Sequence, residues 1–290
     1  MLGGAWLGFL LIACLLVFAW IRRNRRGIGR DTEGRTPGEA VSTWIVVTLG
    51  VALPIAVIAT LFFVADVFVI RTTQAPAATK TAMTVQVIGR QWWWEVRYPG
   101  TGVVTANEIH IPTDTPVLLE ATTADVIHSF WVPELNRKID TIPGQVNEIE
   151  LDAEKAGVYR GQCAEYCGVQ HAHMALDVYA QPAAAYRTWL AHQKRHATPS
   201  TSPGARIFFS NSCTQCHTIR GTSASGTTGP DLTHLMSRAT IAALTLPNTS
   251  ANLAAWITRN QQIKPGNKMV DIAIGGRRLA ELVAYLRTLR

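Results

Sequence analysis

Residues 163–174 of the chain read CAEYCGVQHAHM and gather two cysteines, two histidines and a methionine within twelve positions. The whole chain of 290 residues has only five cysteines. Thiolate, imidazole and thioether side chains are the softer ligands that proteins offer to metal ions. Their density predicts a metal site, which requires a fold that brings these side chains together.

Four interpretations of the cluster compete. A disulfide between Cys163 and Cys167, a zinc site of two Cys and two His, and a turn without metal each fit part of the pattern. Copper fits more of it, because a copper electron-transfer site combines two His and one Cys with a weak Met. One His of such a site comes from a distant strand, and His128 in ADVIHSFWVPEL (residues 124–135) can supply it. The second Cys then exceeds the need of one copper and favours a second metal ion.

The residues around the cluster alternate in the manner of short β-strands. Six runs are rich in β-branched and aromatic residues and are separated by Pro, Gly and Asp: MTVQVI (83–88), WWWEVRY (92–98), NEIHIP (107–112), PVLLEAT (116–122), VNEIELD (146–152) and MALDVYA (174–180). Short strands at this spacing without intervening helices predict a β-sandwich or barrel.

The pattern turns helical after the last of these runs. AAAYRTWLAHQKR (183–195) predicts a helix, and HATPSTSPG (196–204) predicts a flexible linker. In the final segment RRLAELVAYLRTLR (277–290), apolar residues recur at the helical spacing i, i+3, i+4 and i+7: Leu279, Leu282, Val283 and Leu286. The chain therefore continues into a separate helical domain.

Two apolar stretches precede the strands. Residues 2–21 are uncharged, and twenty helical residues span about 30 Å, the thickness of a bilayer core. Residues 44–65 are also uncharged, with Pro54 expected to kink that helix. Six arginines lie between the two stretches, which places this loop in the cytoplasm and both ends of the hairpin outside. A cleaved signal peptide, or lipidation at Cys14, is the competing interpretation of the first stretch.

These features together resemble subunit II of cytochrome c oxidase, the haem–copper terminal oxidase. The resemblance covers about residues 1–180 and rests on the apolar hairpin, CAEYCGVQHAHM and three further stretches: GRQWWWEVRY (89–98), DVIHSFWVPEL (125–135) and KIDTIPGQ (138–145). It implies a cupredoxin-like β-sandwich that carries the dinuclear copper centre CuA.

The resemblance also implies a role for each residue of the cluster. Cys163 and Cys167 would bridge the two coppers. One copper would also be bound by His128 and Met174. The other would also be bound by His171 and the backbone carbonyl of Glu165. The side chain of Glu165 would help to bind a magnesium ion at the interface with subunit I. Trp92, which follows the Gln of GRQWWWEVRY, would be the residue through which electrons reach CuA. Glu39 lies further from the second apolar stretch than the family's acidic residue near the proton channel, so we expect ordinary solvation there.

CTQCH at residues 213–217 is the attachment motif of a c-type haem. Cys213 and Cys216 would form thioethers to the haem, and His217 would be its proximal ligand. A thioredoxin-like CxxC motif is the alternative, but the adjacent His and the helical surroundings disfavour it. GPDL (229–232) resembles the segment of class I cytochromes c that supports the proximal His through its proline, here Pro230.

The sixth ligand of this haem should be a methionine, because Met/His ligation raises the haem potential. Only Met236 and Met269 lie downstream of the motif. Met236 follows GPDLTHL too closely to reach the far face of the haem, so Met269 in KPGNKMVD (264–271) is the predicted ligand. Val270 stands where the family often has proline, and His234 is a weaker alternative.

Charge divides the chain into three blocks. Residues 1–71 carry +3, residues 72–185 carry −6 with 7 basic and 13 acidic side chains, and residues 186–290 carry +10 with 13 basic and 3 acidic side chains. Opposite charge on the last two blocks predicts that they dock on each other. No helix-turn-helix, zinc-finger or RNA-binding signature accompanies the basic block, so we do not expect nucleic acid as a partner.

The sequence therefore predicts a multidomain chain: a two-helix transmembrane hairpin (1–72, spans about 2–21 and 44–70), a cupredoxin-like CuA domain (73–182), a helix and linker (183–203) and an all-α class I cytochrome c domain (204–290). Its expected function is electron input from cytochrome c or another respiratory donor, through haem c and CuA, to oxidase subunit I, which reduces oxygen to water. The expected location is the bacterial inner membrane, with the redox domains on the outer side. A membrane-anchored electron-transfer subunit of a nitric oxide reductase or another respiratory complex is the alternative.

Overall fold

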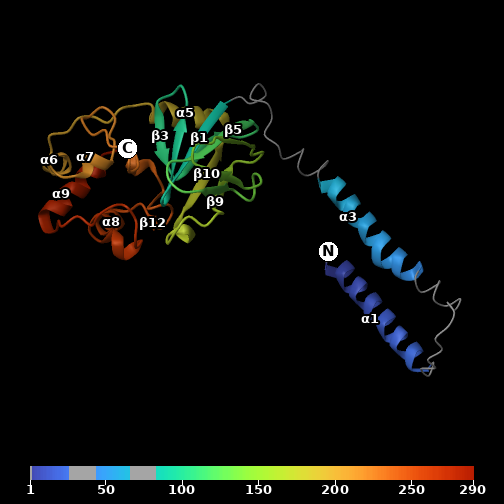
Figure 1. Ribbon diagram of the computed structural model, residues 1–290. Helices are drawn as coiled ribbons and strands as arrows, with labels where there is room; N and C mark the ends of the chain where they lie inside the picture. Colours follow the sequence, from blue (N-terminus) through green and yellow to red (C-terminus); the bar gives the residue numbers. More distant parts are fainter. Residues whose placement is uncertain (1, 26–43, 66–82) are drawn as a thin grey trace. The chain divides into compact units, whose positions relative to one another are not determined.

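The computed structural model describes residues 2–25, 44–65 and 83–290 of the chain. Two compact units are present, Met1–Asp66 with the apolar helices and Val67–Arg290 with a β-sandwich and a helical domain (Figure 1). Glu39, most of the arginine-rich loop and the last residues of the second predicted span lie outside the described residues.

Helices occupy both apolar stretches. Helix α1 (Leu2–Arg25) covers the first and includes the apolar segment Leu10–Ala19. Within the described ranges, one helix is long and apolar enough to cross a membrane, Trp44–Val64, with a mean hydropathy of 2.6. Pro54 lies in the first turn of α3 (Leu53–Val64), directly after the π-helical turn η1 (Thr48–Ala52). A π-helical turn thus lies directly before the proline, which has no backbone N–H to donate, and the kink expected at Pro54 stays a prediction.

Ten strands form a sandwich of two five-stranded sheets. The first sheet has the order β3 (Val103–Ala106), β2 (Trp93–Tyr98), β1 (Met83–Arg90), β5 (Val117–Thr123) and β8 (Asn147–Leu151). The second has the order β4 (Glu108–Pro112), β10 (Ala175–Gln181), β9 (Gly157–Cys163), β6 (His128–Trp131) and β7 (Ile139–Thr141). All six strands predicted from the sequence are confirmed, and β3, β6, β7 and β9 are additional.

The sandwich core follows from the alternation along the strands. Val85 and Val87 of β1 are buried while their neighbours are only partly so, because successive side chains point to opposite faces of a sheet. Trp94 lies fully buried between the sheets, with its ring edge-to-face against Phe130 at a centroid distance of 5.8 Å. This core supports the end of the sandwich where β6 begins and β9 ends.

Helix α5 (Ala183–Gln193) packs on the sandwich through Trp189, whose ring stacks on His110 at 4.1 Å. The segment that follows differs from the flexible linker predicted for it. Ala197 donates its N–H to the carbonyl of Arg220 at 2.9 Å, and the hydroxyl of Ser202 caps the next helix. Hydrogen bonds therefore attach the segment to the helical domain.

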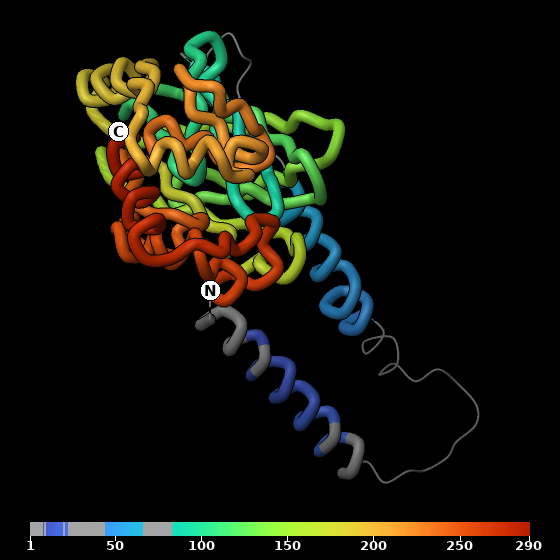
Figure 2. Tube along the Cα trace, turned by 90° about the vertical axis from the view of Figure 1, so that its left-hand side faces the viewer, coloured from blue at the N-terminus to red at the C-terminus, as the bar shows by residue number. Residues whose placement is uncertain are grey.

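The helical domain contains α6 (Pro203–Ser210), α7 (Cys213–Cys216), α8 (Ser250–Ile263) and α9 (Gly276–Leu286), with a short strand pair, β11 (Thr240–Ile241) and β12 (Leu246–Pro247). Gly204 allows α6 and α9 to cross closely, since a Cβ there would lie 1.9 Å from the carbonyl oxygen of Glu281. The apolar stripe predicted on the last helix is confirmed, with Leu282 and Leu286 buried in the core. Figure 1 shows these helices beside the sandwich, and in Figure 2, turned by 90°, they face the viewer in front of it.

Candidate metal and haem centres

Sheet pairing assembles the cysteine and histidine cluster. Strand β6 starts at His128 and β9 ends at Cys163, and the two strands pair with Phe130 opposite Cys163. The chain then loops through residues 164–173 and returns as β10. Cys163 donates its N–H to the carbonyl of Met174 at 2.9 Å, which closes the loop at its base. A distant histidine therefore lies directly beside the loop.

Six candidate donors converge at this point. The Sγ atoms of Cys163 and Cys167 lie 3.7 Å apart, and both cysteines are free thiols. The remaining distances are 3.9 Å from Cys163 Sγ to His128 Nδ1, 3.2 Å from Cys163 Sγ to the Glu165 carbonyl oxygen, 3.7 Å from Cys167 Sγ to His171 Nδ1 and 3.9 Å from Cys167 Sγ to Met174 Sδ.

These distances suit metal coordination. Two sulfurs bound to one tetrahedral ion at about 2.3 Å lie about 3.8 Å apart, close to the separation of the two thiols. His128, Cys163, Cys167 and Met174 are all buried, so the donors are shielded from water. A structural zinc site takes four ligands, whereas six donors including a thioether and a carbonyl fit more than one copper ion. All residues predicted for CuA are thus brought together.

The two thiols share their protons unequally. A hydrogen bond from Cys167 lowers the pKa of Cys163, with His128 and the backbone adding to the effect, while burial opposes it. The same hydrogen bond and burial raise the pKa of Cys167. One buried thiolate is tolerated without a cation, but two adjacent thiolates require positive charge, which metal ions supply.

Asp125 orients the distant ligand, and the sequence analysis missed it as a functional residue. Its Oδ1 lies 2.9 Å from His128 Nε2, so the ring donates from Nε2 and leaves the Nδ1 lone pair facing the thiols. Burial acts to raise the pKa of Asp125, but hydrogen bonds from His128 and from the N–H of Gln91 outweigh it, and the pKa is lowered. Carboxylates that fix a ligand histidine in this way raise its basicity. Its place three positions before His128, inside DVIHSFWVPEL, is the signal that could have identified it.

Trp92 lies against the ligand loop. Its indole Nε1 donates to the carbonyl of Cys167 at 3.0 Å, and the side-chain amide of Gln91 donates to the same oxygen at 2.8 Å. Gly168 follows in a left-handed conformation, and a Cβ there would lie 2.8 Å from the indole carbon Cζ2. The ring therefore contacts the backbone beside a candidate bridging thiolate, and it is 8% exposed.

The haem attachment motif lies on the single turn α7 and the residue after it. Cys213 is half-buried, Cys216 is exposed, and both are free thiols. His217 Nδ1 lies 2.8 Å from the carbonyl of Pro230, which leaves Nε2 available for iron. Burial lowers the pKa of His217 and favours the neutral ring that a metal binds. Gly229 makes room for this ring, since a Cβ there would lie 2.6 Å from His217 Cε1.

The two methionines downstream have different surroundings. Met236 packs against the core of the helical domain, and its N–H donates to the carbonyl of Leu289. Met269 is half-buried, and its loop is held at the backbone, where its N–H donates to Asn267 Oδ1 at 2.9 Å and its carbonyl accepts from Gln261 at 2.6 Å. His234 Nε2 lies 3.0 Å from the carbonyl of Arg195. Of the three candidates, only Met269 combines a fixed loop with a side chain outside the core.

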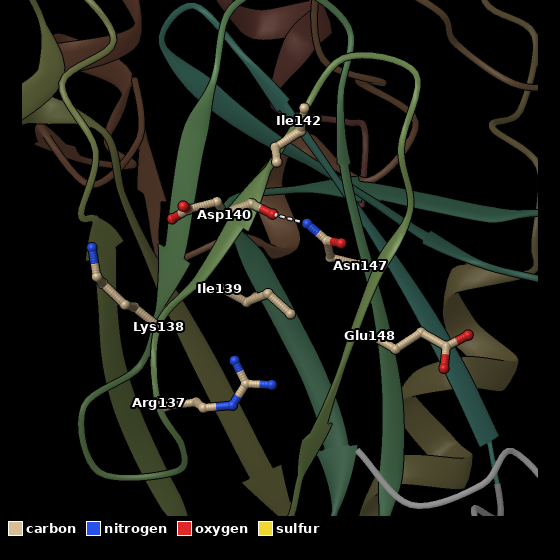
Figure 3. Close-up of a pocket in the computed structure, with 7 residues that line it drawn as sticks. All are labelled: Arg137, Lys138, Ile139, Asp140, Ile142, Asn147 and Glu148. Atoms are coloured by element: carbon tan, nitrogen blue, oxygen red, sulfur yellow. Dashed lines mark hydrogen bonds between the residues drawn. The ribbon is translucent and has the colours of Figure 1, made fainter. Parts of the chain in front are cut away.

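A surface hollow of about 440 Å³ lies elsewhere, along β7 and β8 (Figure 3). Seven residues line it, most of them polar or charged: Arg137, Lys138, Ile139, Asp140, Ile142, Asn147 and Glu148. The side chain of Asn147 crosses it to donate to the carbonyl of Asp140 at 2.6 Å. None of the candidate ligands faces this hollow, so we do not assign the redox chemistry to it.

Both the β-sandwich and the helical domain match known protein families. The family described as "Cytochrome C oxidase subunit II, periplasmic domain" matches residues 102–181, and the family described as "Cytochrome c" matches residues 201–290. Cytochrome c oxidase subunit 2 of Alkalihalophilus pseudofirmus is 33% identical over 290 residues, which cover 97% of this chain and 82% of that protein. The chain belongs to the cytochrome c oxidase subunit II family.

A second relative agrees with this assignment. Cytochrome c oxidase subunit 2 of Bacillus sp. (strain PS3) is 32% identical over 264 residues, covering 85% of this chain and 73% of the relative. The crystal structure of the periplasmic domain of subunit II of the Bradyrhizobium japonicum oxidase is 31% identical; the match covers 42% of this chain and 97% of that one, with a TM-score of 0.40. The chain is thus the electron-input subunit of a cytochrome c oxidase with a fused cytochrome c domain, and its domains imply CuA copper and haem c. The reductase alternative is set aside.

Proposed function

We propose that this chain transfers electrons from an external donor, through haem c in its C-terminal domain, to CuA in its β-sandwich and on to subunit I. When bound, the haem and the copper pair supply the one-electron relay, and the side chains hold them and shape the route between them. Convergence of six donors at the end of the sandwich carries the proposal. Since a thioether and two thiolates are present, the donor set favours copper over zinc.

We assign the ligands as follows. Cys163 and Cys167 would hold both coppers, because their sulfurs are adjacent and each has a histidine Nδ1 within 4 Å. His128 and Met174 would be the further ligands of one copper. His171 and the backbone carbonyl of Glu165 would be those of the other. Trp92 conducts electrons into the pair, a role supported by its hydrogen bond to the carbonyl of Cys167.

In the helical domain, we assign Cys213 and Cys216 to the thioether bonds, His217 to the proximal position and Met269 to the sixth position. The carbonyl of Pro230 holds the proximal ring through Nδ1. This contact leaves His217 one orientation in which Nε2 can meet iron. The fixed backbone on both sides of Met269 supports its assignment.

The remaining assignments concern the membrane and the partners. The segments are a two-helix anchor (1–72), the CuA domain (73–182), a connecting segment (183–203) and the cytochrome c domain (204–290), with both redox domains outside the cytoplasmic membrane. Glu165 has an exposed side chain, which supports a shared magnesium site with subunit I. Cytochrome c or another respiratory protein is the proposed donor.

Metal and haem analysis of the purified full-length chain tests the proposal. We expect two coppers and one covalent haem per chain, with the spectrum of a mixed-valence copper pair. The variant E165Q keeps the carbonyl ligand, so we expect it to retain both coppers and to lose only magnesium from the assembled oxidase. One copper per chain in fully loaded wild-type protein would overturn the CuA assignment.

A further inference from the structure

Lys264 is a lysine buried between the helical domain and the β-sandwich. It follows α8 and is 2% exposed. Its ammonium Nζ donates to three carbonyl oxygens, those of Trp92 at 2.8 Å, His173 at 2.7 Å and Ala242 at 3.1 Å. An ammonium has three N–H groups, and each has one acceptor here. Two of the acceptors belong to the sandwich and one to the helical domain.

The two sandwich acceptors belong to the CuA site. Trp92 is the proposed electron conductor, and His173 directly precedes the candidate ligand Met174. Gly266, two residues after Lys264, extends the same contact, since a Cβ there would lie 3.0 Å from Val169 and 4.0 Å from the indole ring of Trp92. The side chain of Gln170 donates to the carbonyl of Pro265 at 2.7 Å. The segment that leads to Met269 therefore lies on the ligand loop of CuA.

The third acceptor lies in an unusual backbone. Ala242, Ala243 and Leu244 form a run of three left-handed residues with φ of 57°, 57° and 63°, and none is glycine. Such conformations are strained for residues with a Cβ, and surrounding contacts must hold them. Lys264 is one such contact, because its ammonium binds the first carbonyl of the run.

Burying a lysine in this way is unfavourable unless every N–H of the ammonium donates a hydrogen bond. Burial lowers the pKa of Lys264, because it disfavours the charged form, and the three carbonyl acceptors offset this effect. A methionine or leucine would fill the same space without that cost. Packing alone therefore does not explain why this residue is a lysine. Three hydrogen bonds to carbonyls on two domains fix the orientation of one domain on the other, which an apolar side chain cannot do.

We propose that Lys264 is a positioning residue for electron transfer within the chain: it fastens the haem-bearing domain to the backbone of Trp92 and His173 in one orientation. The role in electron transfer rests on the proposed function, but the contact between the two domains does not depend on bound copper. Removal of the ammonium leaves the carbonyls of Trp92 and His173 without their donor and releases the two domains from each other.

A second interdomain contact provides the measurement. Ala239 of the helical domain donates its N–H to the carboxylate of Glu108 on β4 at 2.8 Å, and the neighbouring Arg238 donates to the hydroxyl of Thr105 at 3.3 Å. Neither hydrogen bond involves Lys264 or the carbonyls of Trp92, His173 and Ala242. Exchange of the Ala239 amide with solvent deuterium therefore reports separation of the domains at a site that the substitution leaves intact.

The experiment is hydrogen–deuterium exchange with mass spectrometry on the assembled oxidase, comparing wild type with Lys264→Met. We expect exchange in the peptide that contains Ala239 to accelerate about tenfold to a hundredfold, the equilibrium equivalent of losing one hydrogen bond from a charged donor. Lys194→Met, at an exposed position, is the matched control and should match wild type within about twofold. An unchanged rate in Lys264→Met would overturn the proposal.

Flash-induced electron transfer separates positioning from general damage. In Lys264→Met, we expect haem c oxidation by CuA to slow and to become dependent on solvent viscosity, while electron transfer from CuA to subunit I keeps its wild-type rate. Equal slowing of both steps would also contradict the proposal. If Lys264→Met fails to retain haem or copper, Lys264→Gln is measured instead: its amide has two N–H donors on a shorter side chain and cannot serve all three carbonyls, so we expect smaller changes in the same direction, and an unchanged exchange rate would again contradict the proposal. Failure to bind copper in wild type would refute the proposed function but leave the exchange result interpretable.

Discussion

The copper site and the haem site of this chain are assembled in different ways. The candidate copper donors come from two separate strand ends and a loop, and each lies within 4 Å of a cysteine sulfur because β6 and β9 pair. The residues proposed to hold the haem, Cys213, Cys216 and His217, lie within five consecutive positions, on one short helical turn and the residue after it. In the copper site, tertiary structure brings the donors together. In the haem site, a local motif supplies the attachment residues, and the site is complete only when the haem is attached.

This difference has a physical consequence. The copper donors are buried and carry their own orienting partners, such as Asp125, so the protein meets the cost of bringing them together when it folds. The haem side has an exposed Cys216 and a methionine ligand far along the chain. Loss of one copper donor should therefore damage the whole centre, whereas loss of the axial methionine should change the properties of a haem that stays attached.

The largest effect is expected from Cys163→Ser. A serine hydroxyl is a poor replacement for a bridging thiolate, so we expect loss of the mixed-valence copper signal with one covalent haem per chain retained. Copper analysis and optical spectra of the purified chain measure both. Cys14→Ser, which changes an exposed cysteine of α1, is the control. A variant that keeps two coppers and the signal would show that Cys163 is not a bridging ligand.

On the haem side, Met269→Ala should lower the haem potential and open the sixth position to carbon monoxide, because the thioether ligand is lost. Potentiometric titration and carbon monoxide difference spectra are the measurements. Met236→Ala is the matched variant and should cost some stability through its core contacts without changing either property. The reverse outcome would move the sixth ligand to Met236.

Asp125→Asn tests whether the fold orients the copper donors through their partners. The amide cannot accept from His128 as a carboxylate does, and loss of such a partner typically lowers metal affinity about 10-fold to 100-fold. We expect copper to bind more weakly while the signal of the loaded centre persists, as measured by competition with a copper chelator. Asp140→Asn, on neighbouring β7, should leave the affinity at its wild-type value. Equal losses in the two variants would argue that charge alone, rather than the hydrogen bond to His128, sets the affinity.

The sequence predicted the strands and helices whose apolar residues recur at a regular spacing. The alternating runs predicted six strands, and the apolar spacing at Leu282 and Leu286 predicted α9. Strand β6 has only four residues and β9 has seven, but both were missed because DVIHSFW and VYRGQC mix polar with apolar residues without regular alternation. Those two strands nevertheless place His128 beside Cys163.

The sequence motifs predicted the ligand set but could not identify the groups around it. Asp125 lies three positions before His128, but the motif does not show that its carboxylate meets the ring, and Lys264 reaches Trp92 across 172 positions of sequence. The predicted flexible linker differs from the structure for a similar reason, since the contact between Ala197 and Arg220 is tertiary. Opposite charge predicted that the two domains dock, but Lys264 uses backbone carbonyls instead of acidic side chains.

The smallest effect is expected from Lys268→Met, which removes an ion pair between the domains. Lys268 Nζ lies 3.2 Å from Asp125 Oδ2, and its side chain is 54% exposed. Exposed pairs contribute little and are screened by salt over about 10 Å at 0.1 M, so we expect exchange at Ala239 to rise less than about fivefold. The same substitution at buried Lys264 is expected to exceed that value, and raising the salt concentration should leave the Lys264 effect in place while it removes the Lys268 effect. If Lys268→Met instead gave the larger acceleration and salt abolished it, surface charge, and not the buried ammonium, would hold the haem domain on the copper domain.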